Sequence, residues 1–283
     1  MIIIKLAGGL GNQLFQYSLG RHLAKNQQTI LKMDISNFKN DTLRDYALGV
    51  FKIKEIFATT EEINSFKKKG LGKKFNSFLP YPLKYYIQEN ESAFEKKIFT
   101  TKNNIYIDGY WQSEKYFKAI ENDIRQEITL KEPLGEKCLE IVKKITETNS
   151  ISIHIRHGDY LNDKLSKIFE ICSPEYYTQA ISLMAKKIEQ PYFFIFSDDI
   201  AWAEKNLKTN FPIEYVSKNK FEDYKELVLM GMCKHNIIAN SSFSWWGAWL
   251  NNNHQKIVIA PKTWFKDPAK IIKDIIPDSW IKL

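Results

Sequence analysis

Short apolar runs alternate with segments of helical period along almost the whole chain. Runs of strand length occupy residues 2–7, 30–33, 105–110, 151–155, 192–196, 213–216, 236–239 and 256–260. Segments in which apolar side chains recur every three or four residues occupy 12–23, 113–129, 134–146 and 174–188. This alternation is typical of an α/β protein with parallel sheets.

The length of 283 residues accommodates two domains of ordinary size. We place the connection within 131–149, which predicts an N-terminal domain over 1–148 and a C-terminal domain over 149–283. The last helix is a candidate to pack back on the N-terminal domain. Residues 55–100 are rich in lysine, contain Pro80 and Pro82, and resemble an insertion of helices and loops.

Polar clusters follow the expected strands, at the point where each strand ends. They occupy residues 8–12, 154–159, 197–199, 240–244 and 261–264. Ligands of open α/β sheets bind at the carboxyl edge of the strands. We therefore expect the five clusters to converge on one cleft.

The second of these clusters lies on a strand with alternating side chains. Apolar residues at 151, 153 and 155 alternate with polar ones that include His154 and Arg156, so one face is apolar and the other polar. An arginine fixed on a strand is a two-pronged donor for a diphosphate. A buried arginine–aspartate pair that supports the loop is an equal alternative. His154 and His157 are not spaced as a convergent pair of metal ligands.

The glycine-rich loop at residues 8–13 (GGLGNQ) lets backbone amides approach a phosphate at a helix N-terminus, which we expect Asn12 to cap. The side-chain amides of Asn12 and Gln13 suit sugar or phosphate oxygens. The loop resembles a dinucleotide fingerprint, with Asp34 as the ribose-binding acid, but Leu14 replaces its third glycine. A dinucleotide-dependent oxidoreductase is therefore an alternative function.

Residues 240–246 (NSSFSWW) leave a strand and begin a helix. The amide of Asn240 and the hydroxyls of Ser241 and Ser242 can bind phosphate oxygens. The alternative is a serine helix cap with buried tryptophans. Asp198 and Asp199 form either a metal-binding pair, or one carboxylate that accepts N–H groups from guanine beside one that caps a helix.

Composition narrows the class of protein further. A net charge of +8 fits an anionic ligand, a membrane surface or nucleic acid. The three cysteines are far apart, which indicates neither disulfides nor a cysteine metal site. With no signal peptide and no stretch of about 18 apolar residues, we expect a cytoplasmic protein.

Together these clusters resemble the bacterial α-1,2-fucosyltransferases of glycosyltransferase family 11. The similar stretches run in the same order over nearly the whole chain: 8–17 (GGLGNQLFQY), 152–160 (SIHIRHGDY), 196–199 (FSDD), 235–250 (HNIIANSSFSWWGAWL) and 260–265 (APKTWF). The resemblance implies a GT-B fold, in which two Rossmann-like α/β domains face each other across a cleft. The C-terminal domain binds the donor, and the N-terminal domain mainly binds the acceptor.

The implied activity is that of a galactoside α-1,2-fucosyltransferase. It is the inverting transfer of L-fucose from GDP-β-L-fucose to the 2-hydroxyl of a terminal galactose, without a metal, in glycan or O-antigen synthesis. The implied partners are GDP-fucose and a galactose-terminated glycan, with no nucleic acid. A lipid-linked acceptor would add a peripheral contact with the inner membrane.

The resemblance also assigns roles to residues. Arg156 matches the arginine that holds the donor β-phosphate, and His154 and Asp198 match positions associated with guanine recognition. The segment that contacts phosphate is matched by Ser241 and Ser242, while Gly11 and Asn12 close the site from the other domain.

One position departs from the usual motif. The family pattern reads His-x-Arg-Arg-Gly-Asp, and here the second arginine is His157. Asp159 is the candidate catalytic base, with anchoring of the loop as its alternative role. Competing functions are a GT-B transferase with another nucleotide sugar or linkage, the oxidoreductase, and a carbohydrate-binding protein without catalysis.

Overall fold

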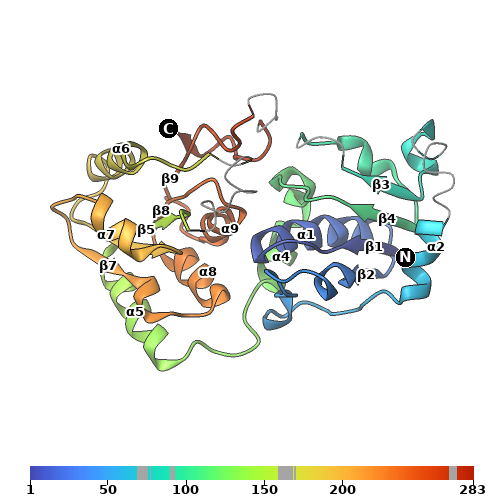
Figure 1. The fold of residues 1–283 in the computed structure, drawn as a ribbon, viewed down its shortest axis with the longest axis horizontal. Helices are drawn as coiled ribbons and strands as arrows, with labels where there is room; N and C mark the ends of the chain where they lie inside the picture. Colours follow the sequence, from blue (N-terminus) through green and yellow to red (C-terminus); the bar gives the residue numbers. More distant parts are fainter. Residues whose placement is uncertain (69–75, 77, 90–92, 159–167, 169, 268–272) are drawn as a thin grey trace. The chain divides into compact units, whose positions relative to one another are not determined.

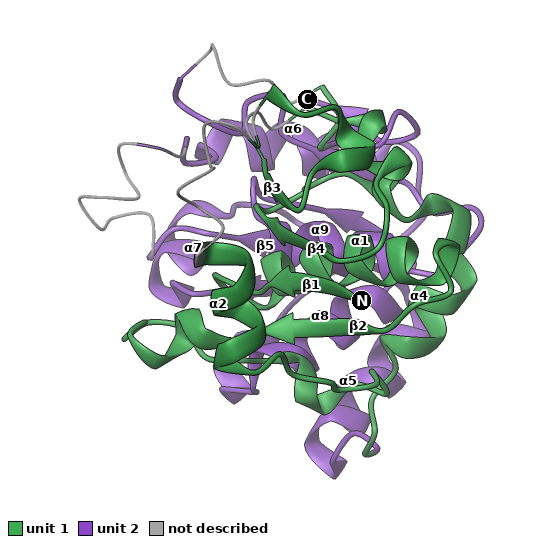
Figure 2. Cartoon of the chain, turned by 90° about the vertical axis from the view of Figure 1, so that its right-hand side faces the viewer, with its two compact units in different colours: residues 1–132, 271–275 green, residues 133–270, 276–283 purple. Residues whose placement is uncertain are grey.

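The computed structural model describes residues 1–68, 76, 78–89, 93–158, 168, 170–267 and 273–283. The chain divides into two compact units (Figure 2). Unit 1 comprises residues 1–132 and 271–275, and unit 2 comprises 133–270 and 276–283. The division after residue 132 lies within the connection predicted at 131–149. It comes before the expected boundary at 148, because helix α5 (Glu136–Glu147) packs its apolar face in unit 2.

Unit 1 contains, among its described residues, a parallel four-stranded sheet in the order β2-β1-β4-β3 (Figure 1). Its strands are β1 (Ile2–Lys5), β2 (Leu31–Asp34), β3 (Tyr86–Gln88) and β4 (Ile105–Asp108). Its helices are α1 (Leu10–Asn26), α2 (Thr60–Lys68) and α4 (Glu121–Glu127). Short 3-10 turns occupy Ser36–Lys39, Leu48–Val50, Tyr81–Leu83, Lys96–Thr100, Glu114–Tyr116 and Lys118–Ile120.

Unit 1 differs from the prediction in two places. Strand β3 lies within the region predicted as an insertion of helices and loops, and it completes the sheet by pairing with β4. Its three residues carry one buried side chain, Ile87, which is too short a pattern to indicate a strand. The helix predicted over 113–129 is two 3-10 turns followed by α4, although its expected inner side chains at 116, 120, 124 and 128 are all buried.

Unit 2 contains, among its described residues, a parallel six-stranded sheet in the order β10-β9-β8-β5-β6-β7. Its strands are β5 (Asn149–Ile155), β6 (Pro191–Ser197), β7 (Ile213–Tyr215), β8 (His235–Ile237), β9 (Val258–Ala260) and β10 (Ile281–Lys282). Its helices besides α5 are α6 (Pro174–Ala185), α7 (Ile200–Asn206), α8 (Asp223–Met232) and α9 (Ser242–Leu250), with a 3-10 turn at Val216–Asn219.

Helices cover both faces of the unit 2 sheet. On one face, the isoleucines of β5 join side chains of α6 and α7 in one apolar cluster. On the other, Phe194 and Phe196 of β6 join side chains of α5 and α8. The predicted start of α6 is confirmed, because Ser173 caps it and Pro174 is its first residue.

Both faces of β5 are buried, including the face that carries its polar side chains. Ser152 is buried, and its hydroxyl accepts a hydrogen bond of 2.7 Å from the side-chain amide of Asn236 on β8. His154, further along the same face, is also buried. The hydrophobic pattern predicted the strand correctly, but these polar side chains lie between sheet and helices rather than at the surface.

Candidate functional site

The carboxyl ends of neighbouring strands gather the polar clusters of unit 2. Strands β9, β8, β5 and β6 are parallel neighbours, so their ends meet at one edge of the sheet. These ends lead into residues 261–264, 240–244, 156–158 and 198–199. The predicted convergence is confirmed for these four clusters. The fifth, 8–12, follows β1 in unit 1.

Arg156 lies just beyond the end of β5 and faces Asp198, just beyond the end of β6. Its Nε atom is 3.3 Å from Oδ2 of Asp198, and both side chains are about one-fifth exposed. The other carboxylate oxygen, Oδ1, accepts hydrogen bonds from the backbone N–H groups of His157 (2.9 Å) and Gly158 (3.1 Å). One carboxylate thus positions the arginine and holds the turn that follows it.

This geometry bears on the roles expected for both residues. The arginine–aspartate pair of the alternative interpretation exists: Arg156 pairs with Asp198, and both side chains are partly exposed. A guanidinium on a strand end, with its orientation set by a carboxylate, is a suitable donor for a diphosphate. The carboxylate of Asp198, which was expected to recognise guanine, binds the loop in this structure.

His154 lies beneath this turn, with its ring packed against Phe243 at 5.6 Å between centroids. Burial, reinforced by the charge of Arg156, lowers the pKa of His154 to about 3, against an opposing effect of Asp198. The imidazole is therefore neutral near pH 7. Its Nδ1 atom is buried and has no hydrogen-bond partner among the described residues. A buried polar atom without a partner is costly, which is consistent with a role in ligand binding.

His157 is held by two contacts. Its Nδ1 atom is 2.8 Å from Oδ2 of Asp199, and its ring stacks on Trp202 with centroids 4.8 Å apart. Asp199 also caps α7, because its Oδ1 accepts a hydrogen bond of 2.9 Å from the backbone N–H of Trp202. These bonds, first from Trp202 and then from His157, lower the pKa of Asp199. Asp199 is therefore the helix-capping member of the aspartate pair.

Replacing His157 with arginine is expected to lower the donor Michaelis constant by about fivefold, because it restores a fixed positive charge beside Arg156. The guanidinium can keep the stack on Trp202. Steady-state kinetics with varied donor at one fixed pH measure the effect of H157R. An unchanged donor Michaelis constant would contradict this interpretation.

Asn240 has an anchoring role in this structure. Its side chain is buried, and its Nδ2 atom donates to the backbone carbonyls of Glu170 (2.5 Å) and Trp264 (2.9 Å). The thiol of Cys172 lies 3.6 Å from its Oδ1. These bonds fasten the segment after β8 to two other loops, so Asn240 supports the site rather than presenting its amide to a phosphate.

Ser241 and Ser242 lie at the start of α9. The hydroxyl of Ser241 accepts a hydrogen bond of 3.3 Å from the backbone N–H of Phe243, so Ser241 is the helix cap. Trp246 and Trp249 are buried, as the alternative interpretation expected. Ser242, the first residue of α9, is half-buried. The N-terminus of α9 thus lies at the same sheet edge as Arg156, where a helix dipole favours negative charge.

The glycine loop of unit 1 differs in one respect from expectation. Helix α1 begins at Leu10 with Gly9 in the cap position, so Gly11 and Asn12 belong to its first turn and Asn12 is not the cap. Gly8 has a φ of +76°, which favours glycine. Asn12 instead accepts a hydrogen bond of 2.7 Å at Oδ1 from the side-chain amide of Gln112.

Two further side chains of unit 1 serve the fold. The buried Gln13 donates to the carbonyls of Gly8 and Asp45, each at 2.8 Å. Asp34 is fully buried and accepts hydrogen bonds from the hydroxyl of Tyr106 (2.5 Å) and the N–H of Ser36 (2.8 Å). Burial alone would raise the pKa of Asp34, but these bonds outweigh it and keep the pKa low. Asp34 is therefore poorly placed to bind a ribose, which argues against the oxidoreductase.

A strained turn follows β4, and no pattern in the sequence predicted it. Trp111 is buried with a φ of +56°, a backbone conformation that large side chains rarely adopt. The carboxylate of Glu89 holds this turn by accepting hydrogen bonds from the N–H groups of Tyr110 (2.6 Å) and Trp111 (3.0 Å). No local pattern marks Glu89 for this role, since it acts across 20 residues of chain. Strain of this kind often accompanies functional sites.

Two further predictions concern the catalytic base and the need for a metal ion. Asp159, the candidate base, lies outside the described residues. Within the described ranges, there is no group of three or more histidine, cysteine, aspartate or glutamate side chains arranged to hold a metal ion.

Comparison with known proteins identifies the family. The profile of glycosyl transferase family 11 matches residues 1–283. The chain belongs to this family. It is 33% identical over 289 residues to an alpha-1,2-colitosyltransferase of Escherichia coli, covering 100% of this chain and 99% of the relative. It is 26% identical over 304 residues to a galactoside 2-alpha-L-fucosyltransferase of Caenorhabditis elegans, covering 100% of this chain and 79% of the relative.

The family 11 chain also resembles a solved structure. Arabidopsis thaliana FUT1, as its R284K mutant in complex with GDP, matches with a TM-score of 0.51 and 11% identity. The match covers 91% of this chain and 69% of that chain. Two units, each built on a parallel sheet flanked by helices, together with this likeness confirm the GT-B fold class.

Proposed function

We propose that this family 11 glycosyltransferase moves L-fucose from GDP-β-L-fucose to the 2-hydroxyl of a terminal galactose. Its membership of the family and its likeness to a galactoside fucosyltransferase support the proposal. The single observation that carries the donor class is the position of Arg156. It is held by Asp198 at the sheet edge where α9 also begins.

In the proposed reaction, negative charge develops on the diphosphate of the donor, which we place at this edge of the sheet. The acceptor hydroxyl oxygen attacks C1 of the fucose, the bond from C1 to the β-phosphate oxygen breaks, and GDP leaves with the electron pair. The configuration at C1 is inverted. Arg156 would stabilise the diphosphate as its charge develops, helped by the N-terminus of α9. We propose that no metal is required, since the guanidinium supplies the positive charge.

Inversion also requires a group that takes the proton from the acceptor hydroxyl. Asp159, three residues after Arg156, is our candidate. Replacing Asp159 with asparagine should lower kcat by about 100-fold or more, with little change in the donor Michaelis constant. Single-turnover rates should show the same loss, which would place it in the chemical step. Turnover close to that of the wild type would instead assign Asp159 to anchoring the loop.

The experiment that tests the function offers the enzyme two GDP-sugars that differ at one carbon. Colitose is fucose without the 3-hydroxyl group. GDP-fucose and GDP-colitose should each be tried with a galactose-terminated acceptor in the presence of a chelator, and the product linkage read by NMR. We expect an α-1,2-linked fucose on galactose as the main product. A different linkage, or no reaction until a metal is added, would overturn the corresponding part of the proposal.

Colitosyl transfer is the second candidate, favoured by the 33% identity to an alpha-1,2-colitosyltransferase over the whole chain. A site built for fucose should form a hydrogen bond with the 3-hydroxyl group of the sugar. Colitose cannot form this hydrogen bond, so its kcat/KM should be lower by a large factor. A site built for colitose should gain little from the extra hydroxyl. The ratio of kcat/KM for the two donors therefore decides between the candidates.

A further inference from the structure

A segment of unit 1 presents large apolar side chains to solvent. Phe78 is 86% exposed and Leu83 is 58% exposed. Leu83 is the last residue of the 3-10 turn Tyr81–Leu83, and Phe78 precedes this turn. Lys96 and Lys97 begin the nearby turn Lys96–Thr100. We name residues 78–84 with Lys96 and Lys97 the 78–84 surface. Two large apolar side chains this exposed within one short segment are unfavourable in water, and we take the segment as a candidate docking surface.

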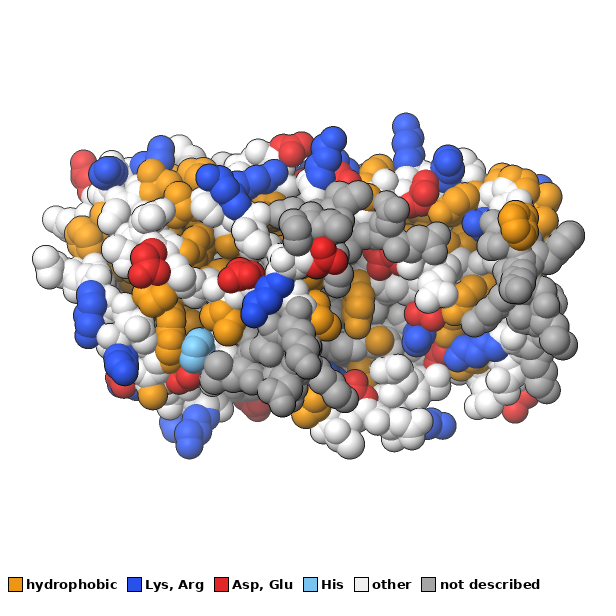
Figure 3. Space-filling model, turned by 45° about the horizontal axis from the view of Figure 1, so that its top comes forward, with side chains coloured by type: hydrophobic (Ala, Val, Ile, Leu, Met, Phe, Trp, Pro, Cys, Tyr) orange, Lys and Arg blue, Asp and Glu red, His pale blue; other side chains and the backbone are white. Residues whose placement is uncertain are grey.

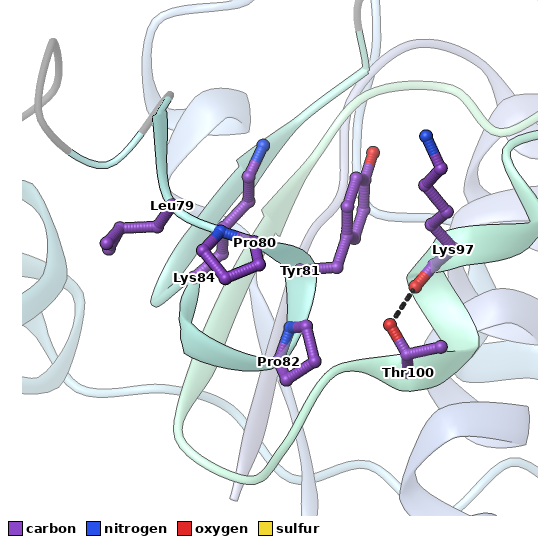
Figure 4. A pocket seen from close by; sticks show the side chains of 7 residues that line it. All are labelled: Leu79, Pro80, Tyr81, Pro82, Lys84, Lys97 and Thr100. Atoms are coloured by element: carbon purple, nitrogen blue, oxygen red, sulfur yellow. Dashed lines mark hydrogen bonds between the residues drawn. The ribbon is translucent and has the colours of Figure 1, made fainter.

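A pocket lies in the same surface. It has a volume of about 440 Å³, and apolar side chains of the segment 79–82 line it together with Lys84 and Lys97. The ammonium group of Lys84 lies 4.6 Å from the ring centroid of Tyr81. Figure 4 shows the ammonium ends of Lys84 and Lys97 and the hydroxyl of Tyr81 on the same side of the pocket. The pocket therefore has an apolar wall and a polar, cationic rim.

The charges at this rim favour an anionic partner. Among the described residues, Lys84, Lys96 and Lys97 form no salt bridge with a carboxylate. Glu95 interacts with the hydroxyl of Tyr81 and accepts a hydrogen bond of 3.2 Å from the backbone N–H of Lys97. The lysine ammonium groups at the rim remain available to an anionic partner. In Figure 3, hydrophobic and basic side chains lie beside one another at the right-hand end of the view.

We propose that the 78–84 surface docks the enzyme on a bilayer with anionic lipid headgroups. Phe78 and Leu83 enter the interfacial region, and the lysines contact lipid phosphates. A protein partner could cover the apolar side chains, but a bilayer also matches Tyr81 and the three lysines, which have no carboxylate partner among the described residues. The proposed attachment is peripheral. None of the helices that the structure describes is long and apolar enough to cross a membrane.

The expected binding is reversible and sensitive to salt. A lysine close to an anionic surface contributes about fivefold to affinity, so three lysines contribute about 100-fold. Burial of a phenylalanine or leucine side chain at the interface adds about tenfold or more each. High salt should weaken the contribution of the lysines and leave that of the apolar side chains. The contributions of the lysines and of the apolar side chains to binding can therefore be measured separately.

The test is co-sedimentation of the full chain with vesicles. Wild-type protein should bind vesicles of phosphatidylcholine that contain about one-third phosphatidylglycerol, and bind pure phosphatidylcholine at least tenfold more weakly. Two double variants, F78S/L83S and K96E/K97E, should each lose at least tenfold in affinity. The matched control is K137E/L139S on α5, where both side chains are also exposed. This control should bind as the wild type does.

A second measurement separates this proposal from the proposed function. With a water-soluble acceptor, F78S/L83S and K96E/K97E should retain wild-type kcat/KM, since neither pair belongs to the donor site. The proposal is overturned if wild-type protein ignores anionic vesicles at low salt, or if F78S/L83S binds them unchanged. It is also overturned if the wild type is a dimer that F78S/L83S dissociates. Vesicle binding by a protein that transfers no fucose would contradict the proposed function alone.

Discussion

Replacing Arg156 with alanine is expected to lower kcat/KM for the GDP-sugar donor by about 1,000-fold. Removing one preorganised donor to a developing negative charge typically costs a factor of this size. Arg156→Lys should recover only part of the loss, because an ammonium group does not reproduce the paired N–H groups of a guanidinium. Steady-state kinetics with varied donor measure both effects.

A matched control distinguishes loss of chemistry from loss of structure. Arg125 of α4 also pairs with a carboxylate, Glu121, at 2.9 Å, and it lies outside the proposed donor site. Arg125→Ala should therefore leave kcat/KM nearly unchanged. Thermal unfolding of both variants should remain close to that of the wild type. If Arg156→Ala kept wild-type kcat/KM, the assignment of Arg156 to the donor diphosphate would be wrong.

The second large effect is expected at Asp198. Asp198→Ala removes the carboxylate that accepts from the backbone N–H groups of His157 and Gly158 and that pairs with the guanidinium of Arg156. We expect the free energy of unfolding to fall by about 2 kcal/mol, and kcat/KM to fall by about 100-fold because the arginine loses its fixed orientation. Urea denaturation and donor kinetics measure the two effects.

A second substitution and an altered nucleotide show how Asp198 acts. Asp198→Asn keeps one oxygen as an acceptor, so it should preserve more stability than Asp198→Ala. Inosine diphosphate lacks the 2-amino group of GDP. If Asp198 reads guanine, the wild type should bind GDP more tightly than inosine diphosphate, and the variants should lose this preference. A preference that survives in Asp198→Ala would restrict the residue to holding the loop.

Alternating side chains made much of unit 2 predictable. Ile151, Ile153 and Ile155 indicate a strand, and all three are in the core. Neighbouring parallel strands end at one edge of a sheet, so the sequence alone could predict that Arg156 and Asp198 lie near each other. The sequence could not predict the direction of the Asp198 carboxylate, because that direction depends on backbone N–H groups that only the folded turn presents.

Unit 1 and the supporting side chains were harder to predict. Strand β3 is stabilised by its pairing with β4 rather than by its own pattern. Asn12, Gln13 and Asn240 are amides that could equally bind a ligand or a backbone group. The choice depends on partners distant in the chain, such as Gln112 for Asn12 and Trp264 for Asn240. Polar residue type and spacing therefore predicted the site region better than the role of each residue.

The central claim is that the sheet edge at the ends of β5 and β6, together with the start of α9, binds guanosine diphosphate (GDP). Isothermal titration of the purified protein with GDP, UDP and NAD, each in the presence of a chelator, tests it most directly. We expect GDP to bind, and UDP and NAD to bind far more weakly or not at all. In the Arg156→Ala variant, GDP should bind at least tenfold more weakly than in the wild type. A preference for UDP or NAD, or GDP binding only when a metal is present, would contradict the account.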